Sequence, residues 1–150
     1  MSYLTHSEYV NFYADGLTPE EFSVLSFQAD RLADVLTTGA DGVRKLAVAM
    51  PTDEVDAEIV KRGIACLIHT MWQVEQMESA AVSRGIAAGG GVSSVSSGSE
   101  SISYGGNGSA IAAAAADPVA KDKLYRSTLV EFFRGVKDAN GINLLYMGVY

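Results

Sequence analysis

Cysteine, histidine and basic side chains are all scarce in this chain of 150 residues. The one cysteine, Cys66, excludes an intrachain disulfide framework. Lys and Arg together number 11 against 18 for Asp and Glu, which gives a net charge of −7. A protein that grips nucleic acid over its whole surface needs Lys and Arg to displace counterions from the phosphates. The composition therefore argues against such a protein and leaves only a local basic patch open.

Long apolar runs are lacking as well. No run approaches the ~20 residues that span a bilayer, and the longest stretch of small apolar residues covers only 110–116. The first basic residue is Arg31, so no positively charged region precedes an apolar segment as it does in a signal peptide. We therefore expect a protein that is made in the cytoplasm and has no membrane partner.

What is present is a hydrophobic fraction of 48%, enough for a folded core. The length suits a single domain over residues 1–150. Thr5 and Glu8 have the spacing of a capping box and predict a short first helix. Thr18-Pro19 followed by Glu21 predicts the start of a second helix, and Gly39 marks its end. Residues 40–50 fit either a short helix or an irregular link.

A long helix is predicted from Asp53 to Ser83 or Arg84 by an apolar stripe with helical spacing. The stripe contains Val60, Ile64, Leu67, Ile68, Met71, Trp72 and Val74. A last helix is predicted to start at Asp117-Pro118 and to continue until Asn140-Gly141 provides turn residues. The expected fold is therefore mainly α: a small helical bundle with a core formed by residues 1–84 and 117–139.

Residues 85–109 differ sharply in composition, because Gly and Ser dominate them. Such a segment is usually a linker. Apolar side chains nevertheless recur in it, and Ser97-Gly98-Ser99 is suited to a turn. We therefore predict a β-hairpin over 85–109, which needs a partner surface because an isolated hairpin is marginally stable. Its apolar residues are Val92, Val95, Ile102 and Tyr104.

The last residues, 140–150, are apolar and aromatic, whereas chain ends are normally polar and frayed. We predict an extended tail that docks either on its own core or on another protein. An extended tail can add main-chain hydrogen bonds to the edge of a partner's sheet, while its side chains fill pockets. The expected docking residues are Ile142, Leu144, Leu145, Tyr146, Met147, Gly148, Val149 and Tyr150.

Residues for catalysis or metal binding are few. Cys66 and His69 are three positions apart, but a zinc site needs further His or Cys ligands. Glu75 and Glu78, one helical turn apart, form either a solvated face or a pair that shares a proton or binds a cation. No serine of the Gly/Ser segment stands in a G-x-S-x-G motif. We expect no enzyme activity, no catalytic or cofactor-binding residue and no metal site.

The order of the segments resembles that of phage head–tail adaptor (connector) proteins. The resemblance starts with "LTHSEYVNFY" and "LTPEEFSVLSFQADRLADVLTTG" and continues with "EIVKRGIACLIHTMWQVEQ". Its most specific parts are "SVSSGSESISYGG", the helix that follows and the ending "LLYMGVY". Met147 stands where the family's ending carries a basic residue.

This resemblance implies a structural role in the virion, at the junction of head and tail. Adaptors form a ring, usually of twelve copies, that extends the DNA channel from the portal protein towards a stopper or tail completion protein. Genomic DNA passes through the channel without specific binding. The family's C-terminal segment embraces the portal, which assigns the portal contact to residues 142–150 here. The hairpin would face the tail.

Two other functions stay open on the sequence alone. The first is a free-standing helical interaction module, in which the Gly/Ser segment is only a linker and the end of the chain packs on its own core. The second is a small hydrolase that uses a serine of the Gly/Ser segment, although no partner base is evident for such a serine.

Overall fold

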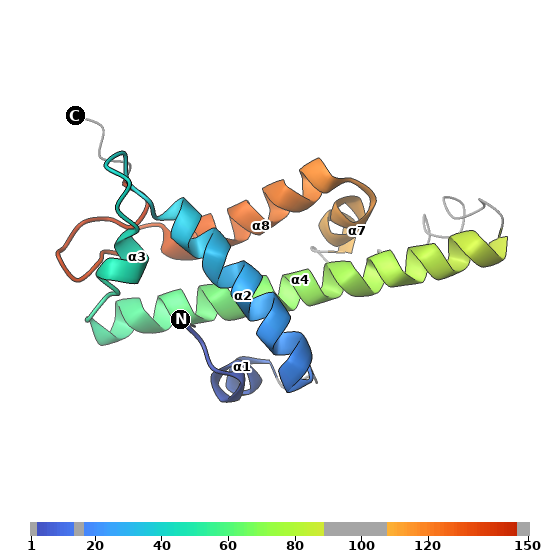
Figure 1. Ribbon diagram of the computed structural model, residues 1–150, viewed down its shortest axis with the longest axis horizontal. Coiled ribbons are helices and arrows are strands. Elements are labelled where there is room, and N and C mark those ends of the chain that lie inside the picture. The colour runs from blue at the N-terminus through green and yellow to red at the C-terminus, as the bar shows by residue number, and fades with distance from the viewer. Residues whose placement is uncertain (1–2, 14–16, 89–107, 147–150) are drawn as a thin grey trace. The chain divides into compact units, whose positions relative to one another are not determined.

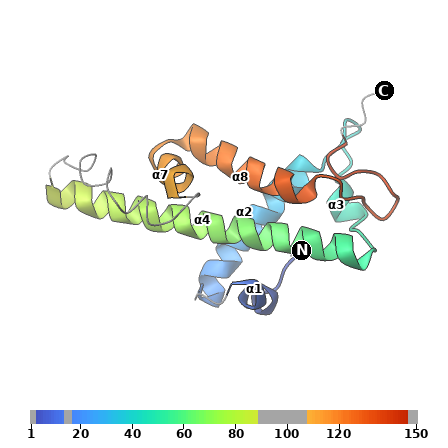
Figure 2. The ribbon, with the colours of Figure 1, turned by 180° about the vertical axis from the view of Figure 1, so that it is seen from behind.

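A computed structural model describes residues 3–13, 17–88 and 108–146, and these residues are mainly helical, with no strand among them (Figures 1 and 2). The helices are α1 (His6–Phe12), α2 (Pro19–Leu36), α3 (Lys45–Val48), α4 (Glu54–Ala88), α7 (Gly108–Ala116) and α8 (Pro118–Phe133). The chain divides into unit 1, residues 1–69 and 126–150, and unit 2, residues 70–125. Within the described ranges, no helix combines the length and hydropathy needed to cross a bilayer.

Capping boxes start α1 and α2, as the sequence predicts. Thr18 Oγ1 accepts a hydrogen bond from the Glu21 N–H at 3.2 Å, and Glu21 Oε1 accepts one from the Thr18 N–H at 3.1 Å. Thr5 and Glu8 form the same pair of bonds at α1. These bonds satisfy N–H groups that have no partner within the helix, so a local four-residue pattern fixes where each helix begins.

Unit 1 is held together by an apolar core to which all its helices contribute. Tyr9 of α1 is fully buried, lies 5.7 Å from the ring of Phe22 and hydrogen-bonds His69 of α4 at 3.1 Å. Gly63 of α4 lies against Phe132 of α8. The other buried apolar residues of unit 1 include Leu4, Leu25, Ala29, Ala33, Leu46, Val60, Ile64, Leu67, Ile68, Leu129, Phe133, Val136 and Leu144. The part of the predicted stripe that lies in unit 1, Val60, Ile64, Leu67 and Ile68, is therefore buried in this core.

Two turns of the same design follow α2 and α8. In residues 39–43 and 138–142, the first N–H donates to the fifth carbonyl, at 3.0 and 2.8 Å. The fourth residue, Gly42 or Gly141, donates to the first carbonyl and has a φ of 81° in both turns. This is a three-residue hairpin loop with a left-handed glycine. We call these two segments the glycine turns. The Ala139 N–H of the second donates to the Ala49 carbonyl just after α3, at 3.0 Å.

Unit 2 has a smaller core. Val74 of α4 is buried with Ile111 and Ala114 of α7, and four partly buried apolar side chains pack against them. These four are Met77, Ala115, Leu124 and Tyr125. Lys121 of α8 forms an ion pair with Glu78 of α4 at 2.7 Å.

The predicted boundaries of the hairpin need correction. The structure is helical at both ends of the predicted segment 85–109, because α4 continues to Ala88 and α7 begins at Gly108. Alanine favours a helix enough for α4 to continue through Gly85, and the alanine-rich run 110–116 favours a helix that the sequence analysis did not predict. Val92, Val95, Ile102 and Tyr104 lie outside the described residues.

The end of the chain also differs from the prediction. The last helix stops at Phe133, not at 139, because Gly135 has a φ of 80° and breaks the helical backbone. Residues 140–146 are not an extended tail. Asn143 pairs with Lys137 in an antiparallel bridge, and the second glycine turn lies between them. The chain therefore folds back onto unit 1 at this point.

Candidate protein-interaction surfaces

The described part of the C-terminal segment is anchored to unit 1. Leu144 is fully buried, and its N–H donates to the Val136 carbonyl at 2.9 Å. The Lys45 ammonium donates to the Tyr146 carbonyl and, at 3.4 Å, to the Thr37 carbonyl. Because Lys45 is itself buried, these carbonyl groups hold its charge inside the protein. These contacts therefore fix the backbone of the segment as far as Tyr146.

The predicted docking residues consequently differ in accessibility. Ile142 is 44% exposed and Tyr146 is 38% exposed, so both are available to a partner. Leu145 is half-buried, and Leu144 serves the core. Met147, Gly148, Val149 and Tyr150 lie outside the described residues. The sequence left open whether the end of the chain packs on its own core or docks on another protein. Leu144 packs on the core of unit 1.

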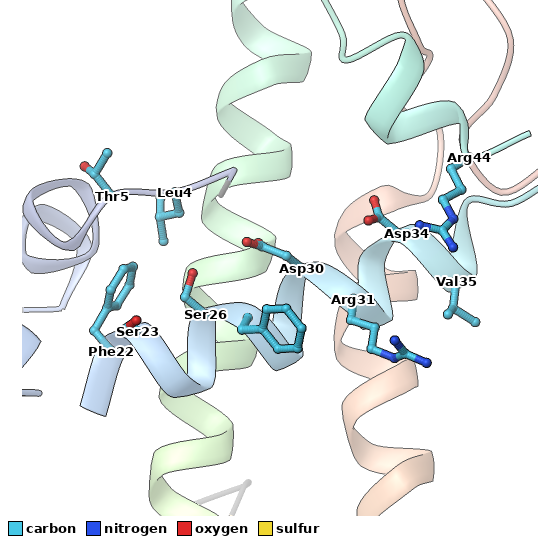
Figure 3. A pocket seen from close by; sticks show the side chains of 11 residues that line it. Leu4, Thr5, Phe22, Ser23, Ser26, Asp30, Arg31, Asp34, Val35 and Arg44 are labelled. Carbon is cyan, nitrogen blue, oxygen red and sulfur yellow. The ribbon is translucent and has the colours of Figure 1, made fainter. Parts of the chain in front are cut away.

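A groove runs along α2 and has a volume of about 580 Å³ (Figure 3). Residues on adjacent turns of α2 line it at intervals of four, which places them along one side of the helix. Leu4 and Thr5 close one end, and Arg44 lies at the other, beside Asp34. The α2 residues are Phe22, Ser23, Ser26, Phe27, Asp30, Arg31, Asp34 and Val35. The groove is long enough to accept about three turns of a helix.

The charges in this groove differ in their exposure. Asp30 is buried, and Asp34 accepts a hydrogen bond from the Tyr3 hydroxyl. Burial raises the pKa of Tyr3, and the hydrogen bond to Asp34 raises it further. Arg31 and Arg44 are exposed. A molecule that enters the groove therefore meets the exposed Arg31 guanidinium, whereas Arg44 lies beside the half-buried Asp34.

The outer face of α2 carries exposed apolar side chains, which the sequence analysis did not identify. Phe27 is 70% exposed, and Val24 and Val35 are also exposed. Together with Arg31 they follow a spacing of three, four and four residues, so they form one stripe on the helix. The opposite face of α2 supplies the core of unit 1, so the helix is apolar on two sides. The spacing of these apolar side chains is visible in the sequence, but spacing alone does not tell which apolar face of the helix stays exposed.

Cys66 and His69 lie in an aromatic setting. The Tyr9 hydroxyl bonds His69 Nδ1 at 3.1 Å, and the Tyr13 ring stacks on the imidazole with the ring centres 4.3 Å apart. Burial raises the pKa of the Tyr13 hydroxyl, and the neighbouring Cys66 thiol raises it further. The described residues hold no group of three His, Cys, Asp or Glu side chains arranged for a metal ion. The cluster fixes α1 to α4 within unit 1.

The carboxylates of Glu75 and Glu78 face different surroundings. Glu78 pairs with Lys121, and Glu75 is exposed. Burial is the main cause of a raised pKa at Tyr125, and the charges of Glu78 and Glu75 add to it. Because a lysine neutralises Glu78, the geometry favours an ion pair over two carboxylates that share a proton.

Comparison of the chain with protein-family models, curated proteins and solved structures found no match. The function therefore has to be inferred from the order of the sequence motifs and from the surfaces of unit 1. Those surfaces are the α2 groove with its apolar stripe and the anchored C-terminal segment. Both are suited to contact with protein, because each combines exposed apolar side chains with polar neighbours.

Proposed function

We propose that the protein is a structural subunit of a phage neck, a head–tail adaptor that forms a ring between the portal protein and a stopper or tail completion protein. The observation that carries this proposal is the order of "SVSSGSESISYGG", a helix and the ending "LLYMGVY", which resembles that of the adaptor family. In this role the ring, usually a dodecamer in that family, extends the channel for genomic DNA. The protein would be a virion component made in the bacterial cytoplasm.

Features of unit 1 support a role in assembly. The α2 groove and the apolar stripe beside it are exposed, as expected of a subunit whose partners are other proteins. Ile142 and Tyr146 are exposed on an anchored backbone, which limits the conformational entropy lost when a portal protein binds them. Leu144, in contrast, has a packing role.

The balance of charge supports the same proposal. A net charge of −7 disfavours tight contact with the phosphates of DNA that passes through a channel. A passive channel requires weak contact because DNA has to slide past it.

Deletion of the gene from its phage or prophage tests the proposal. Electron microscopy of the resulting particles is expected to show DNA-leaking or tailless heads beside free, finished tails. Expression of the wild-type gene in trans should restore tailed virions, which controls for effects on neighbouring genes. Normal tailed virions in the deletion strain would exclude a role at the head–tail junction.

The alternative is a free-standing helical interaction module. The burial of Leu144 and the bond from Lys45 to the Tyr146 carbonyl favour this alternative, because they give the end of the chain a role inside unit 1. Removal of residues 147–150 separates the two hypotheses. An adaptor without them should fold normally but fail to bind the portal, measured by co-sedimentation with portal rings. A free-standing module shows no portal binding in either form.

A further inference from the structure

Further apolar side chains of unit 1 are exposed on α3 and on the first turn of α4. Val48 is 74% exposed and Val55 is 65% exposed. Glu54 and Glu58 are exposed and lie one helical turn apart, next to Val55 on α4. We call Val48, Glu54, Val55 and Glu58 the α4 corner. It is apolar and acidic.

Opposite charges are accessible at the α2 groove and at the α4 corner. In the groove, the Arg31 guanidinium is exposed and Arg44 lies beside Asp34. At the corner, the Glu54 carboxylate is exposed and Glu58 pairs with Arg62 at 3.6 Å. Both surfaces also carry apolar side chains that are exposed in the single chain: Phe27 and Val35 in the groove, Val48 and Val55 at the corner. Burial of these side chains would supply a driving force for contact, and the charges would select its orientation.

We propose that the α2 groove of one subunit receives the first turns of α4 from the next subunit. Val48 and Val55 pack against Phe27 and Val35, and Glu54 lies near Arg31. This inference rests on the proposed ring, for which it names the subunit contact. One subunit then presents two unlike surfaces, as a head-to-tail contact requires. A helix lying in an apolar groove is a common form of protein recognition.

A contact between two identical grooves is disfavoured by the same charges. It would bring Arg31 of one subunit close to that of another, while Asp30 is buried and Asp34 is bonded to Tyr3 and lies beside Arg44. Like charges opposed across an interface are repulsive. The corner supplies the missing acidic partner, and it is present on every copy of the chain. A second copy is therefore the occupant that the charges favour.

Disulfide trapping of the full-length protein tests the proposal. A parent with Cys66→Ser removes the natural thiol, and Phe27→Cys and Val55→Cys are then introduced together. Mild oxidation is expected to give a ladder of dimers, trimers and larger species on a non-reducing gel. The matched control carries Phe27→Cys with Gln76→Cys, an exposed position of unit 2. The test pair should give at least about tenfold more product above the dimer than this control.

Charge reversal tests the orientation of the contact. In the chain with both cysteines, Arg31→Glu should reduce the ladder several-fold because it places a carboxylate opposite Glu54. Adding Glu54→Arg restores an attractive pair and should recover the ladder. A merely misfolded variant would not recover, and equal melting temperatures of the variants provide a second check on folding.

Two results would overturn the proposal. One is a ladder no stronger than that of the control. The other is efficient dimer formation by the Phe27→Cys variant alone, which would indicate contact between two grooves. If the ladder is absent but the gene deletion produces tailless heads, the contact is wrong and the neck function stands. If the ladder forms and the deletion leaves virions normal, the contact stands and the neck function is wrong.

Discussion

Gly63 is the residue at which α4 and α8 lack space for a side chain within unit 1. A β-carbon at this position would lie 2.7 Å from the Phe132 β-carbon, closer than such atoms approach in proteins. The overlap costs up to about 3 kcal/mol, and alanine regains ~1 kcal/mol over glycine in a helix. We therefore predict that Gly63→Ala lowers the free energy of unfolding by a net amount of about 1–2 kcal/mol. Urea denaturation measures it.

The control for this prediction is Gln76→Ala, an exposed position of the same helix. It should change stability by no more than about 0.5 kcal/mol. A Gly63→Ala variant as stable as the wild type would contradict the prediction, because it would show that α8 can move away from α4 with little loss in the free energy of unfolding.

Glu8 contributes to the stability of the folded protein, and this contribution depends on pH. Its hydrogen bond from Lys61 is the main cause that lowers the pKa of the carboxyl, and a bond from the Thr5 N–H adds to this effect. A lowered pKa in the folded state stabilises the protein above the unfolded value of about 4.3. The stabilisation is lost as pH falls through that value towards the folded pKa.

We therefore predict that Glu8→Gln destabilises the protein at pH 7 by about 0.2–1 kcal/mol, the range for exposed ion pairs. The difference from wild type should shrink below about pH 4, where the carboxyl becomes protonated. Urea denaturation between pH 3 and 7 measures it, with Lys61→Met as the control that removes the other partner. A difference that stays constant with pH would contradict this account.

At the scale of elements, the glycine turns provide a prediction about backbone conformation. A side chain at position 42 or 141 meets no atom within 4 Å, so its effect comes from the positive φ alone. Gly42→Ala and Gly141→Ala should each lower stability by about 1–2 kcal/mol. Asparagine tolerates this conformation better, so Gly141→Asn should be milder. Thermal unfolding measures all three, and equal effects of Ala and Asn at 141 would contradict the explanation.

Element boundaries show which parts of the fold are predictable from sequence. The capping boxes at Thr5 and Thr18 are local patterns, so the starts of α1 and α2 follow from four residues each. The end of α8 was also marked locally by Gly135, but the apolar Val136 beyond it favoured a longer helix. Helix α7 was missed because an alanine run lacks the polar face that reveals an amphipathic helix.

At the scale of the whole molecule, the burial of Leu144 was not predictable from sequence. It depends on contacts between segments far apart in the chain, such as the bond from Lys45 to the Tyr146 carbonyl. The apolar stripe on α2 was hidden for a related reason. Phe27 is as apolar as the core residues around it, and periodicity alone does not tell which apolar face of a helix stays exposed.

These contacts give a prediction for truncated proteins. Cutting the chain after Gly141 removes Leu144 and the carbonyl group of Tyr146 that accepts a bond from Lys45. It should lower the free energy of unfolding by about 2–5 kcal/mol, the loss expected for deleting a buried leucine side chain. Cutting after Tyr146 preserves both contacts. The two melting curves measured side by side should therefore differ widely, and similar curves would show that Leu144 adds little to the core.

In both glycine turns the N–H of the fifth residue donates to an aspartate, but this aspartate stands at a different position in each turn. In the first, the carboxylate of Asp41, third in the turn, accepts from the Val43 N–H at 3.0 Å. In the second, Asp138, first in the turn, accepts from the equivalent Ile142 N–H at 2.9 Å. The two turns thus have the same backbone conformation but different sequences. Alanine is second and glycine fourth in both, whereas the aspartate stands at different positions. Comparison of the two sequences finds only the shared alanine and glycine, whereas comparison of donors and acceptors shows that the turns have the same backbone hydrogen bonds.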